Sequence, residues 1–131
     1  MSEPRFLTLE QVLEIHRIQL ELFGGQEGLR DPSALESAIA QPEAGFGEQY
    51  FHSFPYGMAA AYAFHIAENQ PFVDGNKRTA LDSALTFLEA NGVVIEDAEM
   101  SLFQAMIDLG NKRLSKADLT KTFEKLVGKE E

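Results

Sequence analysis

Hydrophobic residues recur every three or four positions along most of the chain, and no alternating strand pattern lasts more than a few residues. Capping boxes at Thr8–Gln11 and Ser115–Asp118 mark the starts of the first and last helices. Asp31 followed by Pro32 marks another helix start. Together with the apolar spacing, these signals predict six helices, over about residues 9–23, 32–41, 55–69, 76–90, 98–109 and from 116 onward.

The predicted helices differ in the surface that they bury. The first is expected to bury an apolar stripe made of Leu9, Val12, Leu13, Ile15, Ile18 and Leu22. The third is rich in alanine, which lets neighbouring helices approach closely, as at the centre of a bundle. Residues 41–54 have no helical pattern and hold an aromatic cluster of Phe46, Tyr50, Phe51 and Phe54. The predicted fold class is all-α, a compact bundle of about six helices, with residues 1–131 in a single domain because no repeat or linker divides them.

Composition and charge exclude cysteine chemistry and argue against nucleic-acid and membrane partners. The 131 residues are 44% hydrophobic and 24% charged, typical of a folded domain, and contain no cysteine for disulfides, zinc–thiolate sites or nucleophiles. A formal net charge of −10 repels phosphate backbones and anionic lipids, so we expect no direct nucleic-acid or membrane partner. No apolar run approaches the ~18 residues needed to span a bilayer, and the start lacks the features of a signal peptide, so the expected location is cytoplasmic.

The most informative segment connects the third and fourth predicted helices, over residues 68–80, and reads ENQPFVDGNKRTA. The first turn of a helix has unpaired N–H groups and a partial positive charge, which together bind phosphate. Gly75 permits a close approach of the backbone to a ligand. Lys77 and Arg78 place two cations where they oppose the helix dipole unless an anion lies between them. The sequence therefore indicates an anion site at the start of the fourth helix.

Two further polar residues of this segment have more than one interpretation. Asp74 places a carboxylate beside the anion site, suited to holding a metal ion or receiving a proton, and Asn76 can donate or accept hydrogen bonds. Either residue can instead serve as the helix cap. Lys77 and Arg78 can also be ordinary solvated charges, and Pro71 with Phe72 is expected to anchor the loop in the core.

The segment resembles the signature of the Fic/Doc family, His-x-Phe-x-Asp/Glu-Ala/Gly-Asn-Lys/Gly-Arg, and is most similar to that of its Doc branch. The matching residues are Phe72, Asp74, Gly75, Asn76, Lys77, Arg78, Thr79 and Ala80. The similarity continues through Gly24–Gly25, Gly28–Pro32 with Glu36, and residues 84–88 with 91–93. It covers the chain from about Thr8 to about Val127. The resemblance implies a compact helical fold and a transferase that moves phosphate or AMP from ATP, with Mg²⁺, to a protein hydroxyl.

The resemblance also implies partners and residue roles. Doc toxins phosphorylate a threonine of a translation elongation factor, and each is paired with an antitoxin, of the Phd type, whose C-terminal segment folds onto the toxin. By position, Asp74 orients the target hydroxyl or binds Mg²⁺. Asn76, Lys77 and Arg78 contact the phosphates of ATP, together with the backbone N–H groups near Gly75.

One position departs from the family pattern, because Gln70 stands where the family has its catalytic histidine. A glutamine amide cannot take up a proton at physiological pH, and losing a general base costs about 10²–10⁴-fold in rate. Phosphoryl transfer depends mainly on positioning and charge stabilisation, so an altered Doc-like toxin with Gln70 and Asp74 at its catalytic centre is the first hypothesis. The second is a catalytically silent family member that binds a nucleotide or a protein.

The three histidines offer no clear replacement for the missing base. His65, one turn before Gln70, is expected to pack against Tyr62 or to face solvent. His52 next to Ser53 is not expected to form a nucleophile–base pair, because adjacent residues rarely do and no oxyanion-hole motif accompanies them. His16 lies on the apolar stripe of the first helix, where a buried structural role is expected.

Overall fold

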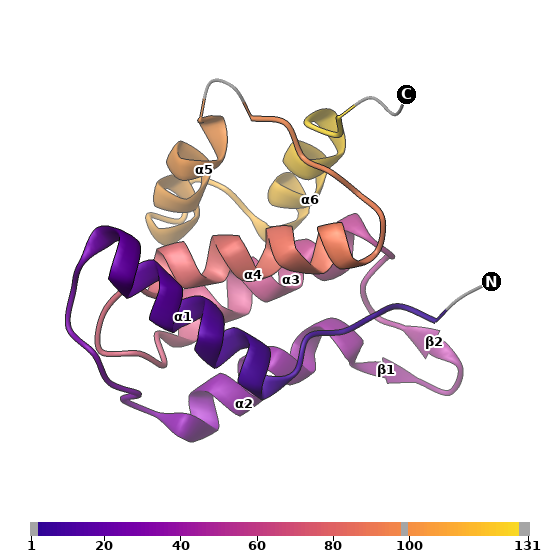
Figure 1. Cartoon of the computed structure of the whole chain (residues 1–131). Coiled ribbons are helices and arrows are strands. Elements are labelled where there is room, and N and C mark those ends of the chain that lie inside the picture. The colour runs from indigo at the N-terminus through magenta and orange to yellow at the C-terminus, as the bar shows by residue number, and fades with distance from the viewer. Residues whose placement is uncertain (1–2, 98–99, 129–131) are drawn as a thin grey trace.

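The computed structural model describes residues 3–97 and 100–128, and this part of the chain contains six α-helices and one small hairpin (Figure 1). The helices are α1 (Leu9–Phe23), α2 (Pro32–Ala40), α3 (Tyr56–Asn69), α4 (Asn76–Ala90), α5 (Ser101–Gly110) and α6 (Lys116–Lys125). A 3-10 turn (Gln41–Glu43) leads into the antiparallel hairpin of β1 (Gly45–Phe46) and β2 (Gln49–Tyr50). The all-α prediction is confirmed, and the small hairpin lies within residues 41–54, where the sequence has no helical pattern. None of the described helices is long and apolar enough to cross a membrane.

The predicted helix starts are confirmed by their caps. Thr8 and Ser115 both form complete capping boxes, and the Asp31 side chain accepts a hydrogen bond from the first turn of α2. The fifth helix begins at Ser101 rather than near 98, and residues 98–99 lie outside the described part of the chain. Its first turn is capped from a distance, because the Asp97 carboxylate accepts from the N–H groups of Ser101 and Leu102 at 2.9 and 2.7 Å. Side-chain caps thus define four of these helix starts.

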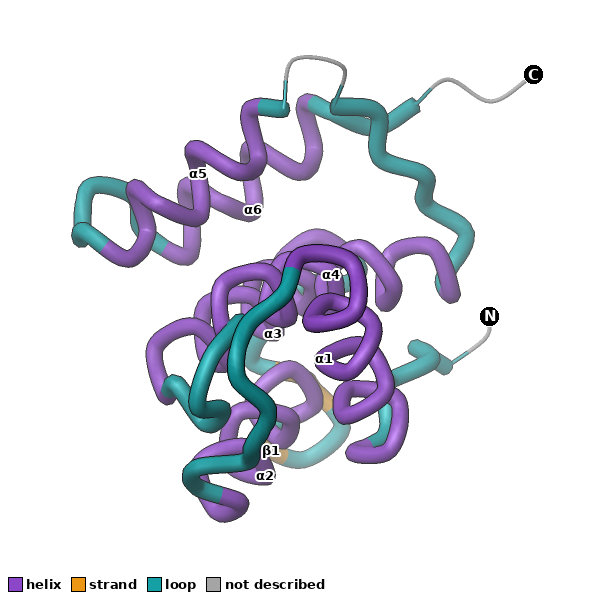
Figure 2. The backbone as a smooth tube through the Cα atoms, turned by 60° about the vertical axis from the view of Figure 1, so that its left-hand side comes forward, coloured by secondary structure: helices purple, strands orange, loops and turns teal. Residues whose placement is uncertain are grey.

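Helix α3 forms the centre of the fold. It packs against α2, α4 and α6, and the residues from Gly57 to Ala63 are all buried. Figures 1 and 2 show α5 and α6 as a pair on one side of α3 and α4, with α1 and α2 on the other side. The alanine-rich sequence of α3 allows this close packing, as predicted.

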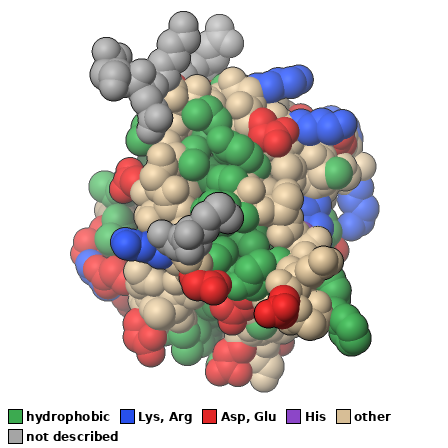
Figure 3. All heavy atoms as spheres, turned by 90° about the vertical axis from the view of Figure 1, so that its right-hand side faces the viewer, with side chains coloured by type: hydrophobic (Ala, Val, Ile, Leu, Met, Phe, Trp, Pro, Cys, Tyr) green, Lys and Arg blue, Asp and Glu red, His purple; other side chains and the backbone are tan. Residues whose placement is uncertain are grey.

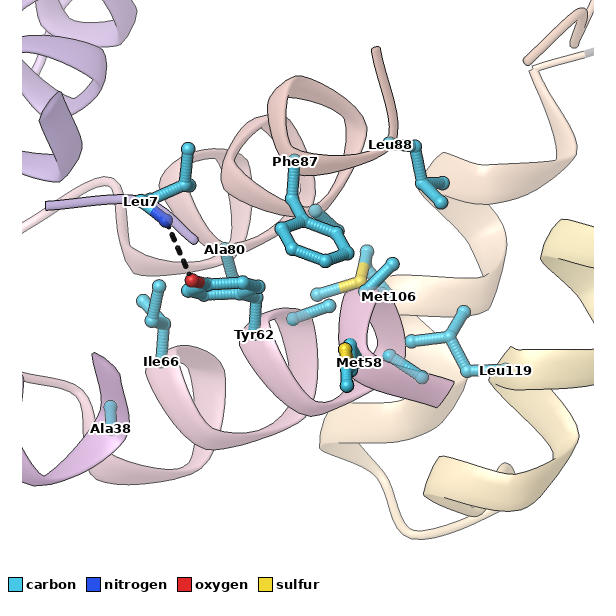
Figure 4. Close-up of a cluster of buried hydrophobic side chains, with 14 of the residues drawn as sticks. Leu7, Ala38, Met58, Tyr62, Ile66, Ala80, Phe87, Leu88, Met106 and Leu119 are labelled. Atoms are coloured by element: carbon cyan, nitrogen blue, oxygen red, sulfur yellow. Dashed lines mark hydrogen bonds between the residues drawn. The ribbon is translucent and has the colours of Figure 1, made fainter. Parts of the chain in front are cut away.

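The core around α3 also fixes the position of the N-terminal segment at Leu7. Figure 4 shows Tyr62 of α3 among buried side chains of α4, α5 and α6, with its hydroxyl directed at Leu7. The Leu7 N–H donates to the Tyr62 hydroxyl oxygen at 2.8 Å. Burial raises the pKa of Tyr62 to about 12, so the phenol stays neutral and keeps this contact at physiological pH.

The apolar stripe predicted for α1 is wrong in its second half. Leu22 is 67% exposed and Ile18 is also exposed, whereas His16 and Gln19 are buried. The buried side of this half carries polar residues instead, because it hydrogen-bonds to α4 and to the loop before it. The Gln19 amide donates to the Asp82 carboxylate of α4 at 3.0 Å.

The aromatic cluster around the hairpin does not cover the core as a unit. Phe46 is 83% exposed and Phe51 is also largely exposed, while Tyr50 packs against Phe6 and Phe54 against Phe87. Figure 3, which views the side where the hairpin lies, shows a strip of hydrophobic side chains crossing this face, with acidic side chains gathered around its lower part and Lys and Arg side chains at the upper right. The lower part of this face therefore combines apolar area with negative charge.

Candidate functional site

Two residues in the left-handed conformation shape the loop between α3 and α4, residues 70–75, which we call the motif loop. Gln70 ends α3 with φ 45° and ψ 57°, and Gly75 precedes α4 with φ 78° and ψ 19°. Pro71 and Phe72 are buried between them, with Phe72 only 2% exposed. Their predicted role as anchors of the loop is confirmed. The two turns bring the end of α3 and the start of α4 to one place.

A cleft of about 430 Å³ lies at this place. Its walls hold all of the residues that the sequence proposed for the site, with Ala67 of α3 and Phe103 of α5 alongside: Gln70, Asp74, Gly75, Asn76, Lys77 and Arg78. The two cations and the one carboxylate are exposed at the cleft, so they are accessible to a ligand. The structure thus brings together the whole set.

The start of α4 offers N–H groups to this cleft. Gly75 is the N-cap residue, and no side chain within residues 3–97 and 100–128 caps α4. The first intrahelical bond runs from the Thr79 N–H to the Gly75 carbonyl at 3.0 Å, so the preceding N–H groups have no helical partner. Together with the helix dipole, they form the kind of site that binds phosphate.

Asn76 has a different role from the cap considered for it. Its side-chain amide donates to the Phe72 carbonyl at 2.9 Å and accepts from the Phe72 N–H at 3.0 Å. These two bonds close the motif loop into a ring. The interpretation of Asn76 as a helix cap is therefore wrong, and its side chain supports the loop.

The Asp74 carboxylate is fixed by two backbone N–H groups. One oxygen accepts from Gly75 at 2.9 Å, and the other accepts from Gln26 in the α1–α2 loop at 3.1 Å. The close approach of this loop depends on Gly25, since a Cβ there would lie 2.8 Å from an Asp74 carboxylate oxygen. Asp74 does not cap α4, so that interpretation is also wrong.

His16 of α1 contacts the motif loop through a hydrogen bond and a ring stack. Its Nε2 lies 2.8 Å from the Asp74 carbonyl oxygen, and because a carbonyl only accepts, Nε2 carries the proton. Its ring stacks on Phe72 with centroids 3.8 Å apart and planes within 8°. The sequence correctly indicated a buried histidine but gave no sign that its partner is the motif loop.

Arg30 is a second residue whose link to the site was missed. Its guanidinium donates to the carbonyl oxygens of Asn69 and Gln70 at the C-terminus of α3, where a cation also complements the helix dipole. The N–H groups of Arg30 and Asp31 donate to the Pro71 carbonyl at 2.7 and 3.0 Å. The segment after α1 is therefore hydrogen-bonded to the motif loop and to the end of α3.

The two cations of the site are held differently. The Lys77 side chain runs past the end of α5, where its Cε would lie 3.0 Å from a Cβ placed on Gly110. The Arg78 guanidinium carbon lies 4.5 Å from the centre of the Phe23 ring, at the last residue of α1. The two cations thus lie next to different helices, Lys77 next to α5 and Arg78 next to α1.

Comparison with known proteins identifies the family. A profile described as the Fic/DOC family matches residues 6–88, more than half of the chain, including the whole motif loop. The chain belongs to the Fic/DOC family. Among its relatives, "Protein kinase doc" of Escherichia phage P1 is 29% identical over 127 residues, which cover 97% of this chain and 99% of the relative. "Toxin Doc" of Mycolicibacterium smegmatis is 40% identical over 88 residues, 67% of this chain and 65% of the relative. The resemblance to Doc toxins is confirmed.

The histidines of this Fic/DOC protein leave Gln70 without a replacement in the cleft. His52 and His65 both face Lys116 of α6, with Nε2 atoms 3.0 and 3.1 Å from its Nζ. Burial, with a smaller contribution from the Lys116 charge, lowers the pKa of His65 to about 4. The structure gives the half-buried His65 a partner that the sequence did not indicate, Lys116, and neither histidine lines the cleft.

A second hollow adjoins the cleft of this Fic/DOC protein. It is an apolar groove of about 590 Å³ between α1, α4 and α5, whose apolar lining includes Leu22, Phe23, Leu81, Leu85, Met100 and Phe103. Arg78 and Phe103 line both the groove and the cleft. Occupants of the two hollows would therefore touch the same side chains.

Proposed function

We propose that this chain is a Doc-like toxin that transfers the γ-phosphoryl group of ATP to a hydroxyl of a target protein. The observation that carries the proposal is the meeting, in one cleft, of an uncapped helix start, two cations and a fixed carboxylate. The relative named as a protein kinase aligns with nearly the whole chain, which favours phosphate transfer over AMP transfer.

Binding of ATP would use the start of α4. The first-turn N–H groups would donate to phosphate oxygens, and the left-handed φ of Gly75 aims them at the cleft without backbone strain. Lys77 and Arg78 would add charge-assisted hydrogen bonds, which are about twice as strong as neutral ones. An otherwise acidic chain thus concentrates two positive charges where a polyphosphate would lie.

Asp74 would face the reacting end of the nucleotide. Each carboxylate oxygen receives one backbone N–H and keeps another acceptor position for the target hydroxyl or a metal ion. Oxygen ligands of this kind suit Mg²⁺, which when bound neutralises phosphate charge. The bonds from Gly75 and Gln26 fix the carboxylate in advance, so little ordering remains at the moment of reaction.

The transfer step forms a bond between the target hydroxyl oxygen and the γ-phosphorus and breaks the bond to the bridging oxygen, so that ADP leaves. The Gln70 amide can orient the hydroxyl, as glutamine does for water in GTP hydrolysis. It cannot accept the proton, which passes to a phosphoryl oxygen or to water. A slower reaction than with a histidine base is the consequence.

Two partners are part of the proposal, by analogy with Doc toxins. One is the target, a translation elongation factor, and the other is an antitoxin segment of the Phd type. The exposed aromatic residues around the hairpin are the first candidate surface for the antitoxin, and the apolar groove beside Arg78 is the second. A segment in the groove would also touch the phosphate cleft through Arg78 and Phe103.

The experiment is incubation of the protein with a cell lysate and ATP labelled at either the γ or the α position. We expect protein labelling from γ-labelled ATP only, and none with Asp74→Ala. Labelling from the α position would show AMP transfer instead. If neither label is transferred under any metal condition while ATP still binds, the chain is a silent member of the family that acts by binding, a reading that Gln70 favours.

A further inference from the structure

Phe23 is an exposed aromatic residue of the apolar groove that adjoins the cleft. It is the last residue of α1, it lines the groove but not the cleft, and it is 59% exposed. Its ring lies under the Arg78 guanidinium at 4.5 Å. Its neighbour Leu22 lines the same groove and is similarly exposed. Leu22 has no aromatic ring, so it cannot form the cation–π contact that Phe23 forms with Arg78.

Arg78 connects the contact with Phe23 to the anion site. Arg78 is the third residue of α4, and helical side chains tilt toward the N-terminus of their helix. The Arg78 side chain lines both the cleft at this helix start and the groove that holds the Phe23 ring. A ring that contacts the guanidinium through its π face leaves N–H groups free to donate to phosphate.

We propose that Phe23 is a positioning residue of the anion site, whose ring holds the Arg78 guanidinium at the rim of the cleft. This inference rests on the proposed function, because it concerns how the same cleft binds the phosphates of ATP. Ordering a long, exposed arginine on ligand binding is costly, and a preformed cation–π contact removes part of that cost. Phe23 itself does not touch the ligand.

The test is titration calorimetry with inorganic tripolyphosphate on the full chain. Phe23→Leu should weaken binding by about 2- to 5-fold, because the guanidinium is no longer ordered in advance by an exposed cation–π contact. Phe23→Tyr keeps an aromatic face and should bind as the wild type does. Leu22→Ala is the matched control and should leave affinity unchanged. In an Arg78→Ala background, Phe23→Leu should have no further effect.

A spectroscopic measurement separates positioning from a general loss of structure. In the wild type, the Phe23 ring current should shift the δ-methylene protons of Arg78, and this shift should vanish in Phe23→Leu and return in Phe23→Tyr. Unchanged or tighter binding by Phe23→Leu would overturn the inference, as would an equal loss in the Arg78→Ala background. If the wild type itself fails to bind tripolyphosphate, the anion site of the proposed function fails with it.

Discussion

Replacing His16 by phenylalanine tests how the motif loop is held. The substitution keeps an aromatic ring to stack on Phe72 but removes the hydrogen bond to the Asp74 carbonyl at 2.8 Å. His16 is only 7% exposed, so the carbonyl loses a donor that water does not readily replace. Leaving such a group without a partner costs about 1–3 kcal/mol, and since the loop is only partly buried we expect a loss of about 1–2 kcal/mol in unfolding free energy.

The substitution should also slow phosphoryl transfer, and by a larger free energy than the loss in unfolding free energy. Asp74 is fixed by its carbonyl and by both carboxylate oxygens, so losing one of these supports shifts the carboxylate in the cleft. Urea denaturation measures the loss in stability, and phosphoryl transfer at a temperature where both proteins are folded measures the loss in rate.

Gln19→Leu provides the matched control for His16→Phe. Gln19 is also buried on α1 with one hydrogen bond, but its partner is Asp82 rather than the motif loop. We expect a similar loss of stability with normal transfer. Equal damage to transfer by both variants would refute the assigned role of His16, as would a His16→Phe protein with wild-type stability and transfer.

Three further predictions address charge, pH and the partner surface. Lys77→Ala combined with Arg78→Ala should weaken ATP binding by about 1–3 kcal/mol per lost contact in calorimetry, and unchanged binding would remove the anion site. His65 has its pKa lowered from 6.5 to about 4, so the unfolded chain takes up a proton first on acidification. Unfolding free energy should therefore fall between pH 6.5 and about 4, by less than about 1 kcal/mol per pH unit after solvent screening, and His65→Phe should flatten that slope in urea titrations. Hydrogen exchange of residues 45–54 should slow when a cognate antitoxin binds, whereas identical exchange with and without it would point to the groove beside Arg78 instead.

Local signals predicted the helices and the place of the site. Thr8 and Ser115 cap their helices as their sequence context indicated, and the spacing of apolar residues gave the bounds of α3 and α4 within one residue. The site was found because Gln70 to Arg78 are close in sequence, so the order of the residues already places them together.

The supports of the site were missed because they are distant in sequence. His16 and Asp74 are 58 positions apart, and Arg30 and Gln70 are 40 positions apart. Helical periodicity reports which side of α1 is apolar, but it does not report that the polar His16 and Gln19 are buried and hydrogen-bonded to the motif loop and to α4. The left-handed turn at Gln70 also had no signal, since glutamine is not a residue that favours this conformation.

The most direct test of the central claim is a side-by-side transfer assay of wild type, Gln70→His and Asp74→Ala with γ-labelled ATP. Histidine is among the residues found more often in left-handed backbone, so it should fit at position 70. We predict that Gln70→His raises transfer by up to about 10²-fold and that Asp74→Ala abolishes it. Transfer that is already as fast in the wild type would contradict the assignment of Gln70 as the limiting residue. Full activity of Asp74→Ala, or no transfer by any of the three while all bind ATP, would contradict the catalytic role of the cleft.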